Sequence, residues 1–240
     1  MTPPGLFLRG RAWAGAAPVF GPVDLRVDPG AWTCLLGPSG TGKSSLLHLF
    51  AGIGGAVRLE GESGASDGAP LQGRVALMGQ ADGLLPWLDA RGNVLLGARL
   101  RQQKGDVART DAMLARVGLE GAGHRRPAAL SGGQRQRVAL ARTLMEDRPV
   151  ALLDEPFSAL DVATRTRMQD LAAHLLAGRT VLHVTHDPAE AARLGERILI
   201  LDAQGLTDAP IPAGPAPRPP ADAATLKATG ALTRLLLEAA

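Results

Sequence analysis

Apolar runs alternate with helical patterns over most of the chain. The runs that we interpret as strands occupy residues 32–36, 74–78, 150–153, 180–185 and 197–201. Several of them are apolar throughout, which is typical of strands buried on both faces of a parallel sheet. Helical patterns follow at residues 43–51, 131–145, 163–176 and 188–194. This alternation predicts an α/β fold in which helices flank a mostly parallel sheet.

Other regions depart from this alternation. Leu6–Arg9 and Val23–Val27 have the pattern of short strands, and they predict an antiparallel β portion near the N-terminus. Residues 81–130 are dominated by helical patterns, one of which ends at Gly118. We therefore predict one domain over residues 1–208, with a helical subdomain at about 81–145 inserted between strands of the sheet.

The C-terminal part has a different composition. Residues 209–220 contain six prolines and predict an extended linker. Residues 221–240 have the pattern of a helical tail with Leu226, Leu232, Leu235 and Leu236 on one side.

Composition narrows the classes of partner. The chain has 240 residues, 45% hydrophobic and 20% charged, and its formal net charge is +3. The nearest basic cluster, formed by Arg135, Arg137 and Arg142, lies on one predicted helix and has no interleaved aromatic residues. We therefore expect no nucleic-acid partner.

Cysteine usage and hydropathy indicate where the chain works. The single cysteine, Cys34, lies in an apolar strand, which predicts an inert buried thiol and a reducing compartment. Met1–Trp13 shows no apolar signal region, and no run approaches the roughly 20 apolar residues of a membrane span. We expect a soluble chain that reaches a membrane only through a partner.

A glycine-rich loop between a predicted strand and a predicted helix carries the first chemical signal. Its residues are Gly37, Pro38, Ser39, Gly40, Thr41, Gly42, Lys43 and Ser44, followed by Ser45. They fit the pattern G-x-x-x-x-G-K-[ST], whose backbone N–H groups wrap phosphates while the lysine reaches the terminal phosphates and the hydroxyl binds Mg²⁺. The positive end of the following helix points at the same phosphates. The loop predicts a site for a nucleoside triphosphate.

Two adjacent carboxylates follow the apolar strand 150–153. The carboxyl ends of parallel strands gather ligands, so we expect Asp154 and Glu155 to lie beside the phosphate loop. Asp154 suits Mg²⁺, which prefers oxygen ligands. Glu155 is then free to accept a proton from a water that attacks the γ-phosphate. The alternative is a polar strand end without a chemical role.

A capped helix start forms a third signal. Ser131 and Gln134 fit the capping-box pattern S-x-x-Q, and Gly132 and Gly133 leave backbone N–H groups bare at the positive end of the helix. Taken alone, these residues are also explained as a helix cap.

The order of these motifs resembles the ATP-binding cassette of ABC transporters. The resemblance covers nearly all of the chain from about Leu6 to Leu201. It includes six signals, which are in chain order Gly37–Ser44, Gln80, Leu130–Gln134, Leu152–Pro156, Ser158–Asp161 and Thr185–Asp187. It implies an ATPase that uses ATP and Mg²⁺.

The resemblance also implies roles for individual residues. Two copies would form a head-to-tail homodimer in which Ser131 and Gly133 of one chain hold the γ-phosphate bound by the other. Gln80 would sense Mg²⁺ and the γ-phosphate, and His186 would support the attacking water. Asp161 would lie at the dimer seam.

One feature departs from the family pattern. An aromatic residue, often tyrosine, usually stacks on adenine about two dozen residues before the phosphate loop, and this chain has no tyrosine. Trp13 is nearest to the expected place, and Phe20 is the second candidate. Plain packing is the alternative for Trp13.

A second apolar segment, Leu84–Trp87, suggests a partner. We expect it to contact a transmembrane permease, because exposed apolar patches mark interaction sites; packing under the helical insertion is the alternative. Residues 80–96 resemble the importer ATPases of the nitrate, sulfonate, taurine and thiamine-precursor group. An extracytoplasmic solute-binding protein would then act indirectly.

The reading favoured by these features is an importer ATPase attached peripherally to the cytoplasmic face of the cell membrane. The alternative hypothesis is a soluble cassette ATPase that acts on nucleic acid or ribosomes, or in DNA repair. A small-molecule kinase leaves Leu130–Gln134 unexplained.

Overall fold

The computed structural model describes residues 2–53 and 55–239 and divides them into two compact units. The first unit contains the chain up to Leu77, then Arg148–Glu155, then the chain from Leu176 onward. The second contains Met78–Asp147 and Pro156–Leu175. Met1, Gly54 and Ala240, which fall within the predicted domain and tail, lie outside the described residues.

One sheet of the first unit is antiparallel. Its strand order is β2-β1-β4, with β1 at Leu6–Ala14, β2 at Ala17–Val27 and β4 at Val57–Ala65. Strands β1 and β2 extend beyond the segments Leu6–Arg9 and Val23–Val27 that the apolar pattern predicts. Gly10 and Gly61 face each other where β1 and β4 approach closely, and a Cβ on Gly61 would lie 1.9 Å from the Arg9 carbonyl oxygen. Glycine permits this pairing but breaks the apolar pattern that predicts a strand.

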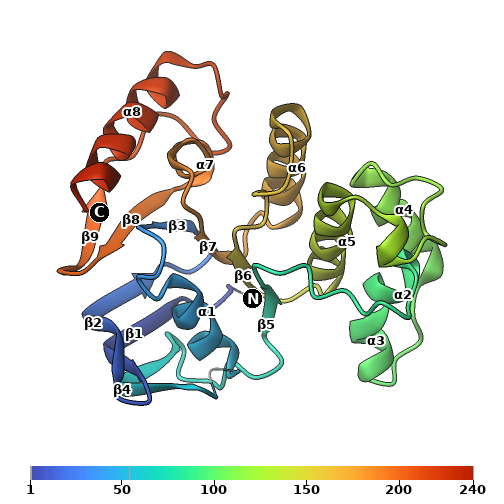
Figure 1. Ribbon diagram of the computed structural model, residues 1–240, viewed down its shortest axis with the longest axis horizontal. Helices are drawn as coiled ribbons and strands as arrows, with labels where there is room; N and C mark the ends of the chain where they lie inside the picture. Colours follow the sequence, from blue (N-terminus) through green and yellow to red (C-terminus); the bar gives the residue numbers. More distant parts are fainter. Residues whose placement is uncertain (1, 54, 240) are drawn as a thin grey trace. The chain divides into compact units, whose positions relative to one another are not determined.

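The other sheet confirms the prediction of a mostly parallel arrangement (Figure 1). Its strand order is β5-β6-β7-β3-β8-β9. The strands are β3 (Trp32–Leu36), β5 (Val75–Met78), β6 (Val150–Asp154), β7 (Thr180–Val184), β8 (Arg197–Asp202) and β9 (Gly205–Ala209). Strand β3 pairs in parallel with β7 and β8, and β6 pairs in parallel with β7. Strand β9, which the apolar pattern does not predict, pairs antiparallel with β8.

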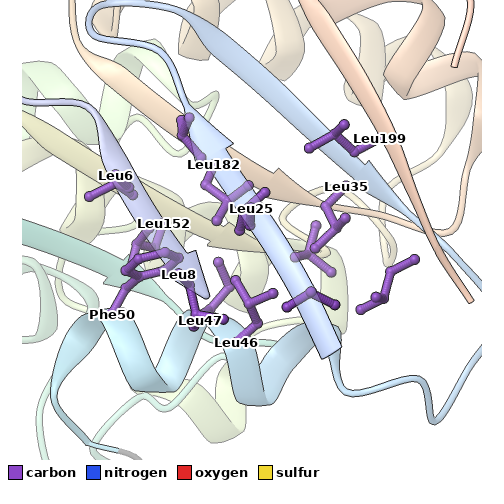
Figure 2. Packing of buried hydrophobic residues seen from close by; sticks show 14 of the residues in the cluster. Leu6, Leu8, Leu25, Leu35, Leu46, Leu47, Phe50, Leu152, Leu182 and Leu199 are labelled. Atoms are coloured by element: carbon purple, nitrogen blue, oxygen red, sulfur yellow. The ribbon is translucent and has the colours of Figure 1, made fainter. Parts of the chain in front are cut away.

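Helix α1 (Lys43–Ala51) joins the two sheets through a common core. Its buried Leu46, Leu47 and Phe50 belong to one apolar cluster with Leu8 of β1 and Leu152 of β6. Figure 2 shows these side chains directed toward one another from strands and helix. Because α1 begins directly at the phosphate loop, this core fixes the loop through the helix that follows it.

The C-terminal part of the first unit contains two helices that pack against each other. They are α7 (Pro188–Leu194) and α8 (Ala223–Glu238), which lie side by side in Figure 1. Asp222 caps α8 by accepting hydrogen bonds from the Ala224 and Thr225 N–H groups. Residues 176–240 cluster with the two sheets as one unit.

The second unit is helical. It contains α2 (Ala90–Val94), α3 (Leu96–Leu100), α4 (Val107–Arg116), a 3₁₀ turn (Pro127–Ala129), α5 (Gly132–Met145) and α6 (Val162–Leu175). The predicted helices at 131–145 and 163–176 agree with α5 and α6 to within one residue. Across the described residues, none of the helices has the length and apolar character needed to traverse a bilayer.

Candidate nucleotide site

The phosphate loop depends on glycine for its shape. Gly37, Gly40 and Gly42 have φ angles of 155°, 84° and 88°, in a region that side chains disfavour. A Cβ on Gly37 would lie 2.2 Å from the Leu201 carbonyl oxygen, and one on Gly42 would lie 2.9 Å from a ring carbon of Phe20. The loop is therefore confined between β8 on one side and β2 on the other, with its backbone N–H groups available to an anion.

Lys43 turns back over this loop. Its Nζ donates hydrogen bonds to the carbonyl oxygens of Gly37 (2.7 Å) and Pro38 (2.6 Å). Burial lowers the pKa of its ammonium group, and the nearby Glu155 and Asp154 carboxylates oppose that shift. The cation is thus held over the loop, where a phosphate would exchange for the carbonyl oxygens.

The other loop residues surround this cation. The Thr41 hydroxyl donates to the Pro38 carbonyl at 3.0 Å, and Ser39 is exposed at the loop tip. Ser44 and Ser45 follow Lys43 in the first turn of α1. The structure therefore brings Gly37–Ser45 together as one cradle at a helix N-terminus.

Asp154 ends β6 in a position that suits a magnesium ligand. Its carboxylate is buried and accepts a hydrogen bond from the Ser44 hydroxyl, and its Oδ1 atom has no hydrogen-bond partner among the described residues. Burial raises the pKa of this carboxyl, and the neighbouring Glu155 charge raises it further. A buried carboxylate oxygen without a partner beside a hydroxyl fits Mg²⁺, which binds hard oxygen ligands. When bound, the ion supplies positive charge at the phosphates.

Glu155 and His186 form a pair at the ends of neighbouring strands. Glu155 Oε1 lies 3.0 Å from His186 Nδ1, and the Glu155 N–H group donates to the Val184 carbonyl. Glu155 has a φ of 48°, which non-glycine residues rarely adopt. With this backbone conformation, the two consecutive carboxylates contact different partners. Asp154 is buried against Ser44, and Glu155 contacts His186.

The two aromatic candidates occupy different environments. Phe20 is buried in the apolar core and contacts the loop at Gly42. Trp13 is partly exposed, pairs with Pro18 across the β1–β2 hairpin, and donates from Nε1 to Glu60 at 3.3 Å. Pro18 precedes Val19, which also contacts Gly42. Of the two, only Trp13 is accessible from outside the protein.

The start of α5 in the second unit is a complete capping box. Ser131 Oγ accepts from the Gln134 N–H at 3.2 Å, and Gln134 Oε1 accepts from the Ser131 N–H at 2.9 Å. Gly132 and Gly133 form the first turn, and a Cβ on Gly133 would lie 3.1 Å from the Ala159 carbonyl oxygen. This helix end is exposed, and its capping box satisfies the Ser131 and Gln134 N–H groups.

Two further predicted residues lie in the same unit. Asp161 precedes α6 and accepts from the Thr164 N–H at 3.0 Å, a bond that lowers the pKa of its carboxyl. Gln80 follows β5 and is exposed. Both are accessible to a ligand or a partner.

Gln136 is a structural residue that the sequence patterns do not single out. It is buried in α5, its Oε1 accepts from the Ala159 N–H at 2.9 Å, and its Nε2 donates to the Ser158 hydroxyl at 3.2 Å. It therefore connects the helix that starts at Ser131 to the segment that leads to Asp161. An amide on the apolar side of α5, two residues before Val138, is the signal that marks it.

Comparisons with known proteins identify the family of this chain. The family model for ABC transporters matches residues 20–158. An aliphatic sulfonates import ATP-binding protein of Rhodococcus jostii is 47% identical over 189 residues, covering 77% of this chain and 74% of the relative. A thiamine import ATP-binding protein of Jannaschia is 43% identical over 199 residues, covering 79% of this chain and 86% of the relative.

The match includes the phosphate loop, the capped start of α5 and the carboxylates that end β6. The chain belongs to the ABC transporter family and is one of its ATP-hydrolysing subunits, with ATP and Mg²⁺ as cofactors.

Proposed function

We propose that this chain is the ATPase subunit of an importer and drives uptake of a small organic solute through a separate permease. The single observation that carries the ATPase mechanism is the Glu155–His186 pair, 3.0 Å apart beside the buried Asp154. Two relatives are named for the import of aliphatic sulfonates and of thiamine, which supports a sulfonate or thiamine as the solute. Nitrate and a thiamine precursor rest on the resemblance of residues 80–96 alone.

Each residue of the site has a task in this proposal. The Gly37–Ser45 backbone and Lys43 bind and orient the phosphates of ATP, while Ser44 and Asp154 hold Mg²⁺. Glu155 accepts the proton of the attacking water, and His186 holds the Glu155 carboxylate and contacts the γ-phosphate. Positioning and fixed charge supply most of the rate of phosphoryl transfer.

Trp13 stacks on adenine in this proposal. The β1–β2 pairing shifts register between Gly10 and Ala12 and again between Ala12 and Trp13. These irregularities accommodate additional residues between Trp13 and the end of β2. The number of residues that separates Trp13 from the phosphate loop therefore still allows Trp13 to lie beside the loop.

A head-to-tail homodimer completes the site. The exposed capping box at Ser131, with Gly132 and Gly133, supplies N–H groups and a hydroxyl to the ATP held by the partner chain. Gln80 relays the state of the phosphates to the helical unit, and Asp161 lies at the seam. The exposure of Ser131 and Asp161 supports this arrangement.

The permease contact centres on Trp87. Its side chain is 67% exposed, whereas Leu84 is buried, so the segment Leu84–Trp87 has one side inside the unit and one side outside. The buried Asn93 fixes this segment: its Oδ1 accepts from the Leu85 N–H at 2.7 Å, and its Nδ2 donates to the Leu85 and Leu88 carbonyls. A rigid exposed tryptophan is typical of an interaction site. The chain would thus sit peripherally at the cytoplasmic face of the membrane, with a solute-binding protein on the other side.

Replacing Glu155 by Gln tests the mechanism. The variant should bind ATP within about threefold of wild type while hydrolysis falls more than about 100-fold, since a general base contributes about 10²–10⁴ in rate. ATP should then accumulate a dimer on size-exclusion chromatography. Glu120→Gln, at an exposed carboxylate of the other unit, is the matched control and should behave as wild type. Wild-type turnover by Glu155→Gln would exclude Glu155 as the base.

Affinity capture from detergent-solubilised native membranes tests the importer assignment. Tagged wild type should retain a polytopic membrane protein, and Trp87→Asp should lose it. Leu100→Asp, at another exposed apolar side chain of the same unit, should retain it. Capture of ribosomal or DNA-associated proteins instead would favour the soluble class of cassette ATPases.

A further inference from the structure

Arg218 is a buried cation in the Pro-rich segment, and it binds α7. Its side chain is 5% exposed, and its Nη1 donates to the carbonyl oxygens of Ala192 (3.0 Å) and Gly195 (2.9 Å). Its backbone N–H donates to the Arg193 carbonyl at 2.9 Å. Its Nε donates back to Gly214 in its own segment at 3.0 Å. Arg218 therefore joins the C-terminal end of α7 to the segment that precedes α8.

These contacts satisfy a specific need of α7. The last carbonyl groups of a helix lack partners within the helix and carry partial negative charge. Burial lowers the pKa of the Arg218 guanidinium, and the Glu196 carboxylate nearby opposes that shift. Without Arg218, the buried Ala192 and Gly195 carbonyls would lose a charged donor, which is costly away from water.

The N-terminal end of α7 lies close to His186 in the chain, because the helix begins at Pro188 with Asp187 as its cap. The Asp187 side chain caps the helix by accepting from the Ala189 N–H at 2.8 Å, and the Asp187 N–H donates to the Thr185 hydroxyl at 3.0 Å. The Thr185 hydroxyl donates to Glu190 of α7 at 2.8 Å. These bonds tie the residues on both sides of His186 to the first turn of the helix.

A helix this short moves as one body. At 1.5 Å per residue, its seven residues span only about 10 Å, so a shift at its C-terminal end is transmitted to the residues around His186. Helix α8 packs along α7 (Figure 1). Its Thr225, Ala228 and Leu232 side chains are buried. The C-terminal segment thus supports α7 at its end and along its side.

We propose that Arg218 is a positioning residue for His186, and that residues 209–238 serve as a clamp on α7. This deepens the proposed function and rests on the role of His186 given there. Arg218 itself contacts neither nucleotide nor water in this proposal. Its effect reaches the reaction through the helix that follows His186, and it gives the C-terminal segment a role within the ATPase unit.

Arg218→Ala tests the proposal, with Arg234→Ala as the matched control at an exposed arginine on α8. A shift of about 1 Å at a reacting group can cost about 100-fold, so kcat should fall about ten- to a hundredfold while KM for ATP stays within about twofold. Arg218→Lys should recover part of the loss, and Arg234→Ala should match wild type.

A second readout does not depend on hydrolysis. The imidazole Cε1–H signal of His186, assigned by its absence in His186→Ala, should move or broaden in Arg218→Ala and stay unchanged in Arg234→Ala. An unchanged signal would overturn the proposal whatever the activity. If Arg218→Ala does not fold, the same measurement on Arg218→Gln decides in the same way. Wild-type kcat in His186→Ala, together with a displaced signal in Arg218→Ala, would contradict the catalytic role of His186 and leave the clamp supported.

Discussion

The phosphate loop and the start of α5 both present backbone N–H groups at a helix N-terminus, but they differ in how they are completed. In the loop, Lys43 bonds to main-chain carbonyls and the buried Asp154 keeps one oxygen without a partner among the described residues. At α5, Ser131 and Gln134 satisfy each other.

This difference separates two kinds of binding site. Burying the polar and charged groups of the loop is costly until a bound ligand pairs with them. Nucleotide and Mg²⁺ should therefore stabilise the unit that contains the loop. The start of α5 is capped without a ligand, so the binding role proposed for it would add to this structural role. The variants below address each half of this contrast.

The largest effect is expected for Lys43→Ala. Removing the cation held over the loop should reduce ATP hydrolysis more than about 100-fold, because fixed charge at the phosphates supplies several kcal/mol of transition-state stabilisation. Steady-state hydrolysis with saturating Mg²⁺ measures it. Lys104→Ala, at an exposed lysine, is the control and should keep wild-type activity. Activity of Lys43→Ala within a few-fold of wild type would mean that the loop works without its cation.

The next effect concerns two glycines, one in each site. Gly42→Ala should lower the free energy of unfolding by about 1–3 kcal/mol, because its φ of 88° and its contact with Phe20 both oppose a side chain. Gly132→Ala meets nothing closer than 3.9 Å and should raise stability by about 0.5 kcal/mol, since alanine favours a helix. Denaturant unfolding compares the two. Equal effects would remove the distinction between a constrained loop and a relaxed helix start.

The free energy of unfolding should depend on pH through Asp154, whose buried carboxylate has one oxygen without a hydrogen-bond partner among the described residues. Because burial raises its folded pKa above the unfolded value, its contribution to stability is present below the unfolded pKa and is lost as pH rises through the folded pKa. Nucleotide-free Asp154→Asn should therefore be more stable than wild type by about 1–2 kcal/mol at pH 7, with a smaller difference near pH 4.

Thermal unfolding across this pH range measures the effect. Mg²⁺ and ATP together should raise the Tm of wild type and add little to Asp154→Asn. Asp170→Asn, at an exposed carboxylate, should follow wild type throughout. Parallel pH curves for wild type and Asp154→Asn would show that the buried carboxylate is already satisfied.

The smallest loss of stability is expected at Ser131. Ser131→Ala should cost about 1 kcal/mol by removing the cap, whereas Ser131→Asp should keep the cap and most of the stability. If the hydroxyl holds a phosphate, both variants should lose ATPase activity. Alanine lacks the hydroxyl, and the carboxylate of aspartate repels the phosphate. Wild-type activity in Ser131→Asp would show that Ser131 is a cap alone.

Much of this arrangement follows from local signals in the sequence. The bounds of α1 and α7 agree with the helices predicted at residues 43–51 and 188–194. The parallel sheet follows from its fully apolar strands. The family match supports the ATPase assignment that these motifs suggest.

The parts that local patterns miss depend on distant partners. The extent of β4 is set by close pairing with β1 through Gly10 and Gly61, and β9 becomes a strand by pairing with β8. The bond between Arg218 and α7 joins residues 23 and 26 positions apart. No periodicity within either segment encodes it. Likewise, the reach of Glu155 toward His186 depends on a φ that residue type does not specify.

The burial of Cys34 has a practical consequence for labelling this protein at chosen sites. Its thiol is fully buried in β3, and burial, reinforced by the Glu190 charge, raises its pKa, so little reactive thiolate forms at neutral pH. We therefore expect the native protein to react little with maleimides. A cysteine introduced at an exposed site such as Leu100 or Arg234 would carry a spin label or fluorophore alone, without removal of the native thiol. Distances between two subunits could then be followed through the ATP cycle.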